Sequence, residues 1–290
     1  MLNLIKRCRD AIVQLFVSVC AFSAITLLPA SAQAAGTALE VGVLPNVSAR
    51  VLMDQYLPMQ AYLSRRLGQS VQVSTAPDWR EFYQRARRGD YDVVIAAANV
   101  ARLMEKDLGF RPVLAYGPKI PALLIAARRS EGADPQRLLQ GNAVAMANPA
   151  SLVVFEGLNW LARHNLEVDR DFRTLIVRRD DSVGRAVLRG EAAVGMLSMG
   201  EYLGHPEAVR EQLRVVSTMA EVASFIVCVN PSLAAPQVLE LRSALLEFGQ
   251  GTDEGKQFFN RTGFKTIMPV NEKDMVVLDS FVDKTRNALD

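Results

Sequence analysis

Polar residues that follow predicted strands are the residues of this sequence best suited to hold a ligand. Two segments about a hundred residues apart share one pattern, in which an apolar run ends at a proline and a serine and a helical pattern follows. The first contains Asn46 and Ser48 after Pro45, and the second contains Asn148 and Ser151 around Pro149. Proline ends the strand, and serine is a good helix cap. The free N–H groups at such a helix start suit an anion or a polar ligand head, although an ordinary strand-to-helix turn is the alternative.

Three more candidates follow the next predicted strands. Asp78 and Trp79 come after the strand predicted at Val71–Ser74, and Asn99 comes after the strand predicted at Asp92–Ala96. Ligands of open parallel sheets bind at the carboxyl ends of the strands, where these residues are expected. Trp79 could stack on a ligand or simply cover its own helix, whereas Asp78 and Asn99 are each expected to cap a helix.

A charged segment follows the strand predicted to end near Arg178. Asp180 could contact a cationic ligand head or cap the next helix through a backbone N–H group. Arg178 and Arg179 could hold an anion, but side chains alternate along a strand, so that at most one of the two faces the site.

No arrangement of residues predicts catalysis, a metal or a cofactor. His164 and His205 lie in settings typical of exposed turns, without a partner at metal-ligand spacing. Ser151 lacks the glycines of a nucleophile elbow, and there is no phosphate-binding Gly-Lys loop or dinucleotide fingerprint. Cys228 is expected to be a small buried apolar residue.

The N-terminus has the features of a secretory signal peptide, predicted over residues 1–34. A basic start precedes the apolar run Ala11–Leu28, and Ala30-Ser31-Ala32 fits a cleavage site. A retained anchor is the alternative. A lipid on Cys20 is disfavoured, because Val19 stands where a small residue is wanted. Removal of this peptide would place the protein in the periplasm.

The remaining chain carries no net charge. The signal peptide contains three basic residues and one acidic residue, so that 30 of the 33 basic and 30 of the 31 acidic residues remain. No charge excess favours nucleic acid as a partner. Half of the residues are hydrophobic and 22% are charged, as in a globular protein.

The order of elements predicts an α/β fold. Strands and helices alternate from the first loop onward, which is typical of an open parallel sheet with helices on both faces. From Pro236 the chain is expected to be helical to its end, apart from turns at Gly263 and Pro269. Two lobes joined by a two-segment hinge are predicted, with residues 36–121 and 224–290 in lobe one and residues 122–223 in lobe two.

The sequence resembles the phosphate/phosphite/phosphonate-binding subfamily of periplasmic ABC-transporter substrate-binding proteins. The resemblance rests on these segments: Val41-Gly42-Val43-Leu44-Pro45, the stretch from Pro58 to Leu67-Gly68, Arg88-Gly89-Asp90-Tyr91-Asp92, Asn148-Pro149-Ala150-Ser151 and Arg189-Gly190-Glu191. It implies a two-lobed type II periplasmic-binding-protein fold with two mostly parallel sheets, no enzymatic activity, and a small polar solute between the lobes. It also implies an inner-membrane ABC permease as partner and a monomeric protein. A membrane sensor in place of the permease is the alternative.

The sequence departs from this family at its ligand loops. Family members place a Ser-Thr-Ser-Gly-Tyr run at the second-lobe loop, of which Ser151 alone is present here, followed by apolar residues from Leu152 to Phe155. Asp180 replaces a histidine, and Trp79 replaces a tyrosine. These departures predict weak binding of simple alkylphosphonates and a ligand that is less anionic, larger or more apolar, unless Arg178 or Arg179 restores the anion site.

Overall fold

The computed structural model describes residues 38–130, 132 and 134–290. Residues Ala38–Asp290 form one compact unit. The predicted signal peptide lies outside the described residues. Within residues 38–290, apart from 131 and 133, no helix is long and apolar enough to span a membrane.

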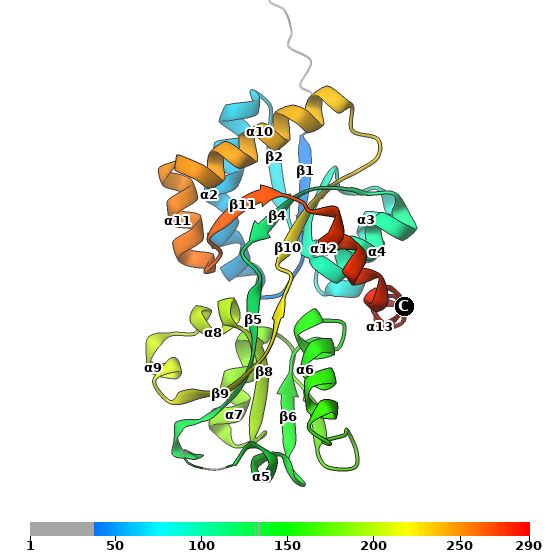
Figure 1. The fold of residues 1–290 in the computed structure, drawn as a ribbon. Coiled ribbons are helices and arrows are strands. Elements are labelled where there is room, and N and C mark those ends of the chain that lie inside the picture. The colour runs from blue at the N-terminus through cyan, green and yellow to red at the C-terminus, as the bar shows by residue number, and fades with distance from the viewer. Residues whose placement is uncertain (1–37, 131, 133) are drawn as a thin grey trace, which may run out of the picture. The chain divides into compact units, whose positions relative to one another are not determined.

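Two β-sheets organise this unit (Figure 1). The first sheet has six strands in the order β11-β4-β10-β3-β1-β2, and the second has five in the order β7-β6-β8-β5-β9. We call the first sheet with its helices the first lobe, and the second sheet with its helices the second lobe. The chain enters the second sheet with β5 after β4, and returns to the first with β10 after β9.

The bounds of the elements are as follows. The strands are β1 (Leu39–Val43), β2 (Val71–Ser74), β3 (Val93–Ala97), β4 (Arg111–Gly117), β5 (Ile120–Ala127), β6 (Ala143–Met146), β7 (Arg173–Ile176), β8 (Val194–Ser198), β9 (Leu213–Val222), β10 (Phe225–Val229) and β11 (Thr266–Pro269). The α-helices are α2 (Ala49–Leu67), α3 (Trp79–Arg88), α4 (Ala98–Leu108), α5 (Pro135–Leu139), α6 (Leu152–Arg163), α7 (Val183–Arg189), α8 (Met199–Gly204), α9 (Glu207–Arg210), α10 (Ala235–Gly251), α11 (Asp253–Thr262), α12 (Glu272–Val277) and α13 (Val282–Leu289). Short 3₁₀ helices are η1 (Arg128–Ser130), η2 (Asp180–Ser182) and η3 (Leu278–Phe281).

The α/β class with two sheets is confirmed, but both sheets are mixed rather than mostly parallel. β1 is parallel to β2 and β3, whereas β10 is antiparallel to β3 and β4. In the second sheet β6 is parallel to β7 and β8, whereas β5 is antiparallel to β8 and β9. The antiparallel partners include the strands that carry the chain between sheets, and their direction could not be read from local sequence patterns.

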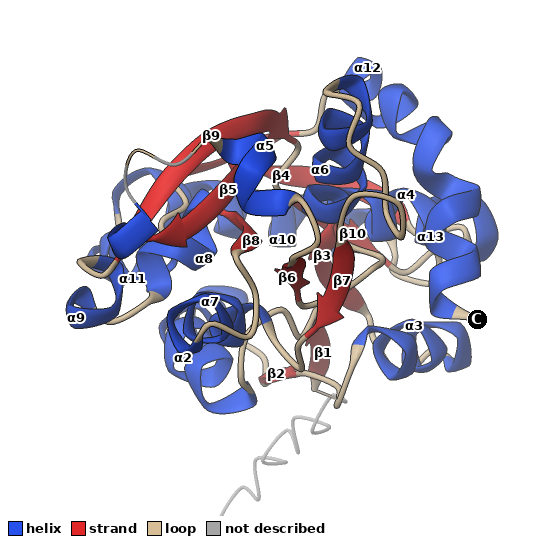
Figure 2. Cartoon of the chain, turned by 90° about the horizontal axis from the view of Figure 1, so that it is seen from below, coloured by secondary structure: helices blue, strands red, loops and turns tan. Residues whose placement is uncertain are grey.

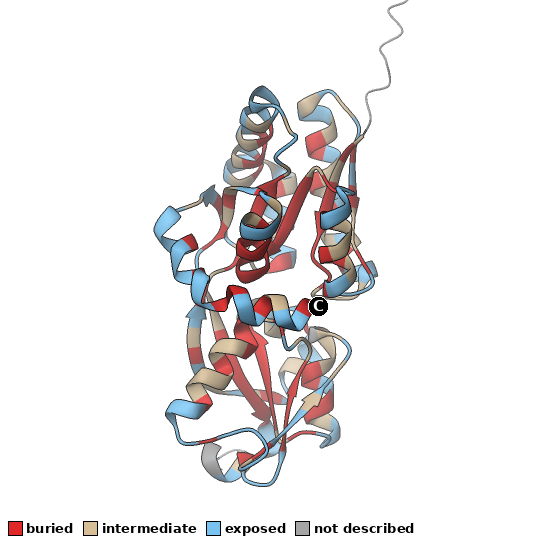
Figure 3. Ribbon diagram, turned by 90° about the vertical axis from the view of Figure 1, so that its right-hand side faces the viewer, coloured by how far each residue is buried: buried red, intermediate tan, exposed pale blue. Residues whose placement is uncertain are grey.

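Helices cover both faces of the first sheet, as expected for strands that are apolar on both sides (Figure 2). All five residues of β3 are buried, and they alternate between two apolar cores: Val93 and Ile95 pack with α2, α10 and α11, whereas Val94 and Ala96 pack with α3 and α4. The buried residues of Figure 3 accordingly follow the strands, while the outer helix faces are exposed.

The second sheet is covered by α6 on one face and by α7 and α8 on the other. The core beneath α6 is continuous with the core around α3 and α4 of the first lobe, since both belong to one cluster of buried apolar residues. The core beneath α7 is separate.

The C-terminal segment differs from the prediction. Residues Thr266–Pro269 form β11, which pairs antiparallel with β4 at the edge of the first sheet. Its side chains are partly exposed, so that no clear apolar alternation marks it as a strand. The pairing with β4 is a tertiary interaction that outweighs local sequence preference.

Candidate functional site

A cavity of about 1010 Å³ lies between the two lobes. Its first-lobe wall comes from the β1–α2 loop, α2, the start of α3, the end of β3 and the end of α11. Its second-lobe wall comes from the starts of α6 and α8, from η2 and from α7. The cavity therefore lies at the carboxyl ends of β1, β3, β6 and β8, where an open α/β sheet binds its ligand.

The first-lobe wall contains two of the residues predicted from the sequence, Asn46 and Trp79. Trp79 is the first residue of α3 and is 7% exposed. Ser48 precedes α2 as its N-cap residue but makes no side-chain hydrogen bond there, and it does not line the cavity.

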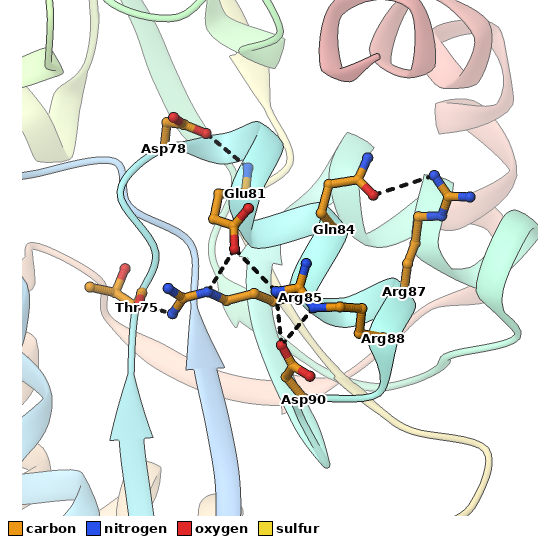
Figure 4. Close-up of polar contacts among 8 residues, drawn as sticks. All are labelled: Thr75, Asp78, Glu81, Gln84, Arg85, Arg87, Arg88 and Asp90. Atoms are coloured by element: carbon orange, nitrogen blue, oxygen red, sulfur yellow. Dashed lines mark hydrogen bonds and ion pairs between the residues drawn. The ribbon is translucent and has the colours of Figure 1, made fainter.

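Asp78 caps α3, as predicted (Figure 4). Its Oδ1 accepts a hydrogen bond from the backbone N–H of Glu81 at 2.8 Å. The carboxylate of Glu81 in turn pairs with Arg85 at 3.2 Å and with Arg88 at 3.1 Å. Asp78 is outside the cavity lining and fixes the helix start that presents Trp79.

The second-lobe loop turns as the sequence predicted. Oδ1 of Asn148 accepts from the backbone N–H of Ala150 at 2.9 Å, and the backbone carbonyl of Asn148 accepts from the N–H of Ser151 at 3.0 Å. Asn148 therefore holds the turn and does not line the cavity. Ser151 lines the cavity and caps α6.

The start of α6 combines backbone donors with apolar side chains. Ser151 Oγ accepts from the backbone N–H of Val153 at 3.2 Å. The first N–H groups of a helix have no partner inside the helix, and among the described residues nothing else accepts from the N–H groups of Leu152 and Val154, which leaves them to a ligand or water. The side chains of Leu152 and Val153 line the cavity.

Asn99 is a structural residue in this arrangement. The prediction that it caps a helix is wrong, because the N-cap of α4 is Ala97 and Asn99 lies inside the first turn. Its side chain is fully buried, and Nδ2 donates to the backbone carbonyl of Ala150 at 2.8 Å and to Oγ1 of Thr285 at 2.9 Å. Asn99 thus joins α4, the second-lobe loop and α13 without lining the cavity.

Charged side chains line the part of the cavity formed by η2, α7, α8, α2 and α11. The acidic residues are Asp54, Asp181 and Glu201, and the basic residues are Arg185 and Arg261. Glu201 is engaged in a capping box with Ser198, and Nη1 of Arg261 donates to the carbonyl of Asp54 at 3.0 Å. Within the described part of the chain, the side chain of Arg185 forms no ion pair or hydrogen bond, so its guanidinium group is available to an anion.

Arg185 was not predicted from the sequence. It lies in the middle of the exposed face of a short helix, a position that is ordinary for arginine. The neighbouring prediction, Asp180, falls in η2, and its side chain lies outside the described residues, whereas Asp181 lines the cavity.

The predicted arginine pair does not line the cavity. Arg178 is exposed, and Nη1 of Arg179 donates to the backbone carbonyl of Val47 at 3.1 Å, which links the second lobe to the first. The sequence left open that Arg178 or Arg179 turns into the site and restores an anion site. Neither side chain lines the cavity, so the structure does not support this alternative.

His205 lies in the cavity wall and not in an exposed turn. It is 3% exposed, and its Nε2 has no hydrogen-bond partner among the described residues. The prediction of an exposed histidine is wrong because the ring packs against Gly184, whose missing side chain leaves room for it. Burial lowers the pKa of His205, although the nearby carboxylate of Asp181 opposes this.

Within the described ranges, no group of three or more His, Cys, Asp or Glu side chains could hold a metal ion. Cys228 is fully buried, as predicted, and burial raises the pKa of its thiol.

Comparison with known proteins identifies the fold and the family. The family model for periplasmic substrate-binding proteins of phosphonate ABC transporters matches residues 41–275. A comparison with curated protein sequences gives no match.

Solved structures share the fold at low sequence identity. A binding protein component of a phosphonate ABC transporter from Pseudomonas aeruginosa has a TM-score of 0.74 and 18% identity, with 87% of this chain and 89% of that chain covered. A Prochlorococcus marinus protein in complex with methylphosphonate has a TM-score of 0.74 and 14% identity, with 86% and 98% covered. A Xanthomonas citri protein bound to ATP has a TM-score of 0.69 and 19% identity, with 87% and 99% covered.

The matched family is a family of periplasmic transport proteins, not of enzymes. Since its model spans the chain from β1 into α12, this protein belongs to the periplasmic substrate-binding proteins of phosphonate ABC transporters.

Proposed function

We propose that this protein captures a phosphonate-class organic anion in the cavity between its lobes and delivers it to an inner-membrane ABC permease. The observation that carries the proposal is that the first turn of α6, from the second lobe, lines the cavity together with Trp79, the first residue of α3 in the first lobe. Helix N-termini attract anions through free N–H groups and the helix dipole. Arg185, free of protein partners among the described residues, adds a positive charge to the second-lobe wall.

The proposed hinge consists of the two connections between the sheets. Residues 118–119 join β4 to β5, and residues 223–224 join β9 to β10. We propose lobe one at residues 36–121 and 224–290 and lobe two at residues 122–223, with a ligand that touches both lobes favouring closure. The protein acts as a monomer, and the signal peptide, residues 1–34, is removed on export.

Calorimetric titration with a panel of phosphonates of different organic groups, with phosphate, sulfonates and amines as comparators, tests the proposal. We expect at least one phosphonate to bind and the amines not to bind. Arg185→Gln should weaken that phosphonate at least tenfold, because a hydrogen bond to a charged group contributes about 1.5–3 kcal/mol.

Arg189→Gln is the matched control for this experiment. It makes the same change on the same helix, but Arg189 pairs with Glu191 at the surface and is absent from the cavity wall. The affinity of this variant for the phosphonate should equal that of the wild type. A panel without a bound phosphonate, or an Arg185→Gln variant that binds like the control, would overturn the proposed function.

A further inference from the structure

We infer that the solute is an amphipathic phosphonate, in which the anionic head carries an alkyl or aromatic group much larger than methyl. This inference rests on the proposed function, because it concerns the same cavity.

The apolar part of the cavity wall is continuous across both lobes. It consists of Trp79, Ala97 and Phe225 from the first lobe and Leu152, Val153 and Val222 from the second. These residues belong to, or pack against, one cluster of buried apolar side chains. An apolar ligand group placed there would pack against apolar side chains of both lobes and would be removed from water.

The start of α6 offers few side-chain donors to a small, doubly charged head. Ser151 is the single hydroxyl of this turn; its Oγ accepts from the N–H of Val153 and keeps its own O–H to donate, while the next two side chains, Leu152 and Val153, are hydrocarbon. A charged oxygen placed against them would lose hydration without a replacing hydroxyl. The head is therefore held by backbone N–H groups, the hydroxyl of Ser151 and Arg185, and the side chains of Leu152 and Val153 contact the organic group.

The size of the cavity agrees with this assignment. Its volume of about 1010 Å³ is at the upper end of the roughly 300–1,000 Å³ that drug-sized ligands occupy. A methylphosphonate would fill only a small part of this volume.

Calorimetry with methyl-, n-butyl-, n-hexyl- and phenylphosphonate tests the inference. Each methylene buried in an apolar site strengthens binding about fourfold, so n-butylphosphonate should bind at least tenfold more tightly than methylphosphonate. The phenyl compound should also exceed the methyl compound. A submicromolar dissociation constant for methylphosphonate, or equal affinities along the series, would overturn the inference while leaving the proposed function intact. If the whole series failed to bind while another phosphonate of the broader panel bound, the inference alone would fail.

A pair of isosteric variants locates the apolar subsite. Val153→Thr replaces one methyl group of the cavity wall by a hydroxyl and should weaken n-hexylphosphonate at least threefold more than methylphosphonate. Val187→Thr makes the same change in a buried position of α7 outside the cavity and should leave both affinities unchanged. Thermal unfolding of each variant verifies that it is folded. If Val153→Thr kept the wild-type preference for n-hexylphosphonate over methylphosphonate, the alkyl chain of the ligand would lie elsewhere, and the assignment would be contradicted.

Discussion

The bond between Asn99 and Ala150 should couple the stability of the protein to the closure of its lobes. Asn99 belongs to α4 of the first lobe, and the carbonyl that it binds belongs to the loop before α6 of the second lobe. The second bond of the same amide group, to Thr285, stays within the first lobe, because α13 packs on α4. Separation of the lobes therefore breaks the first bond and keeps the second.

The effect of Asn99→Ala can be estimated from these contacts. Two buried hydrogen bonds are lost, each with a net value of about 0.5–1.5 kcal/mol, and the Ala150 carbonyl is left unsatisfied. Removal of Asn99 Oδ1, which is buried without a partner among the described residues, offsets part of the loss. We expect the free energy of unfolding to fall by about 1–3 kcal/mol, with a decrease in Tm of about 2–4 °C per kcal/mol.

Thr285→Val is the matched variant for this prediction. It removes the hydroxyl that Asn99 contacts within the first lobe but leaves the bond between the lobes in place. Urea unfolding should show both variants destabilised, whereas calorimetry with n-hexylphosphonate should show weaker binding for Asn99→Ala alone. Equal binding by Asn99→Ala and Thr285→Val would refute the coupling to closure. An unfolding free energy of Asn99→Ala within about 0.5 kcal/mol of the wild type would refute the hydrogen-bond argument itself.

Three further predictions follow from single residues. Because the pKa of His205 is lowered in the folded protein, the unfolded chain takes up a proton more readily than the folded one. The free energy of unfolding should therefore decrease as the pH falls below about 6.5. Urea unfolding between pH 8 and 5 should show this decrease, and the decrease should be smaller in His205→Asn. Gly42→Ala would place a Cβ 2.7 Å from the ring of the buried Tyr91 and should cost about 1–3 kcal/mol of unfolding free energy, whereas Gly251→Ala, which meets no atom within 4 Å, should be nearly neutral; equal stabilities would contradict the packing argument. The thiol of Cys228 should not react with a thiol reagent until the protein unfolds, because it is fully buried and burial raises its pKa; rapid labelling of the native protein would show that the strand β10 opens.

Local patterns predicted most of the elements because strand and helix signals are properties of short segments. The two strand–Pro–Ser–helix segments became β1 with α2 and β6 with α6, and both serines occupy the N-cap positions. The mixed direction of the sheets and the strand β11 were missed, since both depend on which distant strand becomes a neighbour.

The site was predicted in part for a similar reason. Asn46, Trp79 and Ser151 line the cavity, because the carboxyl ends of strands are a reliable location for ligands. Arg185 was missed because an arginine on the exposed face of a short helix is ordinary. His205 was missed because its burial depends on packing against Gly184 of α7, which no spacing in the sequence reports. Asn99 follows a strand as a ligand residue would, but the return of α13 to α4 gives its amide group a structural partner.

A crystal structure of the protein, from crystals grown with n-hexylphosphonate, is the most direct test of the central claim. This claim is that an organic anion binds between the two lobes. We expect the ligand in the cavity, with its phosphonate oxygens within hydrogen-bond distance of backbone N–H groups at the start of α6 and its alkyl chain against Trp79 of the opposite lobe. A ligand that contacts one lobe alone, or that binds outside the cavity, would contradict the account.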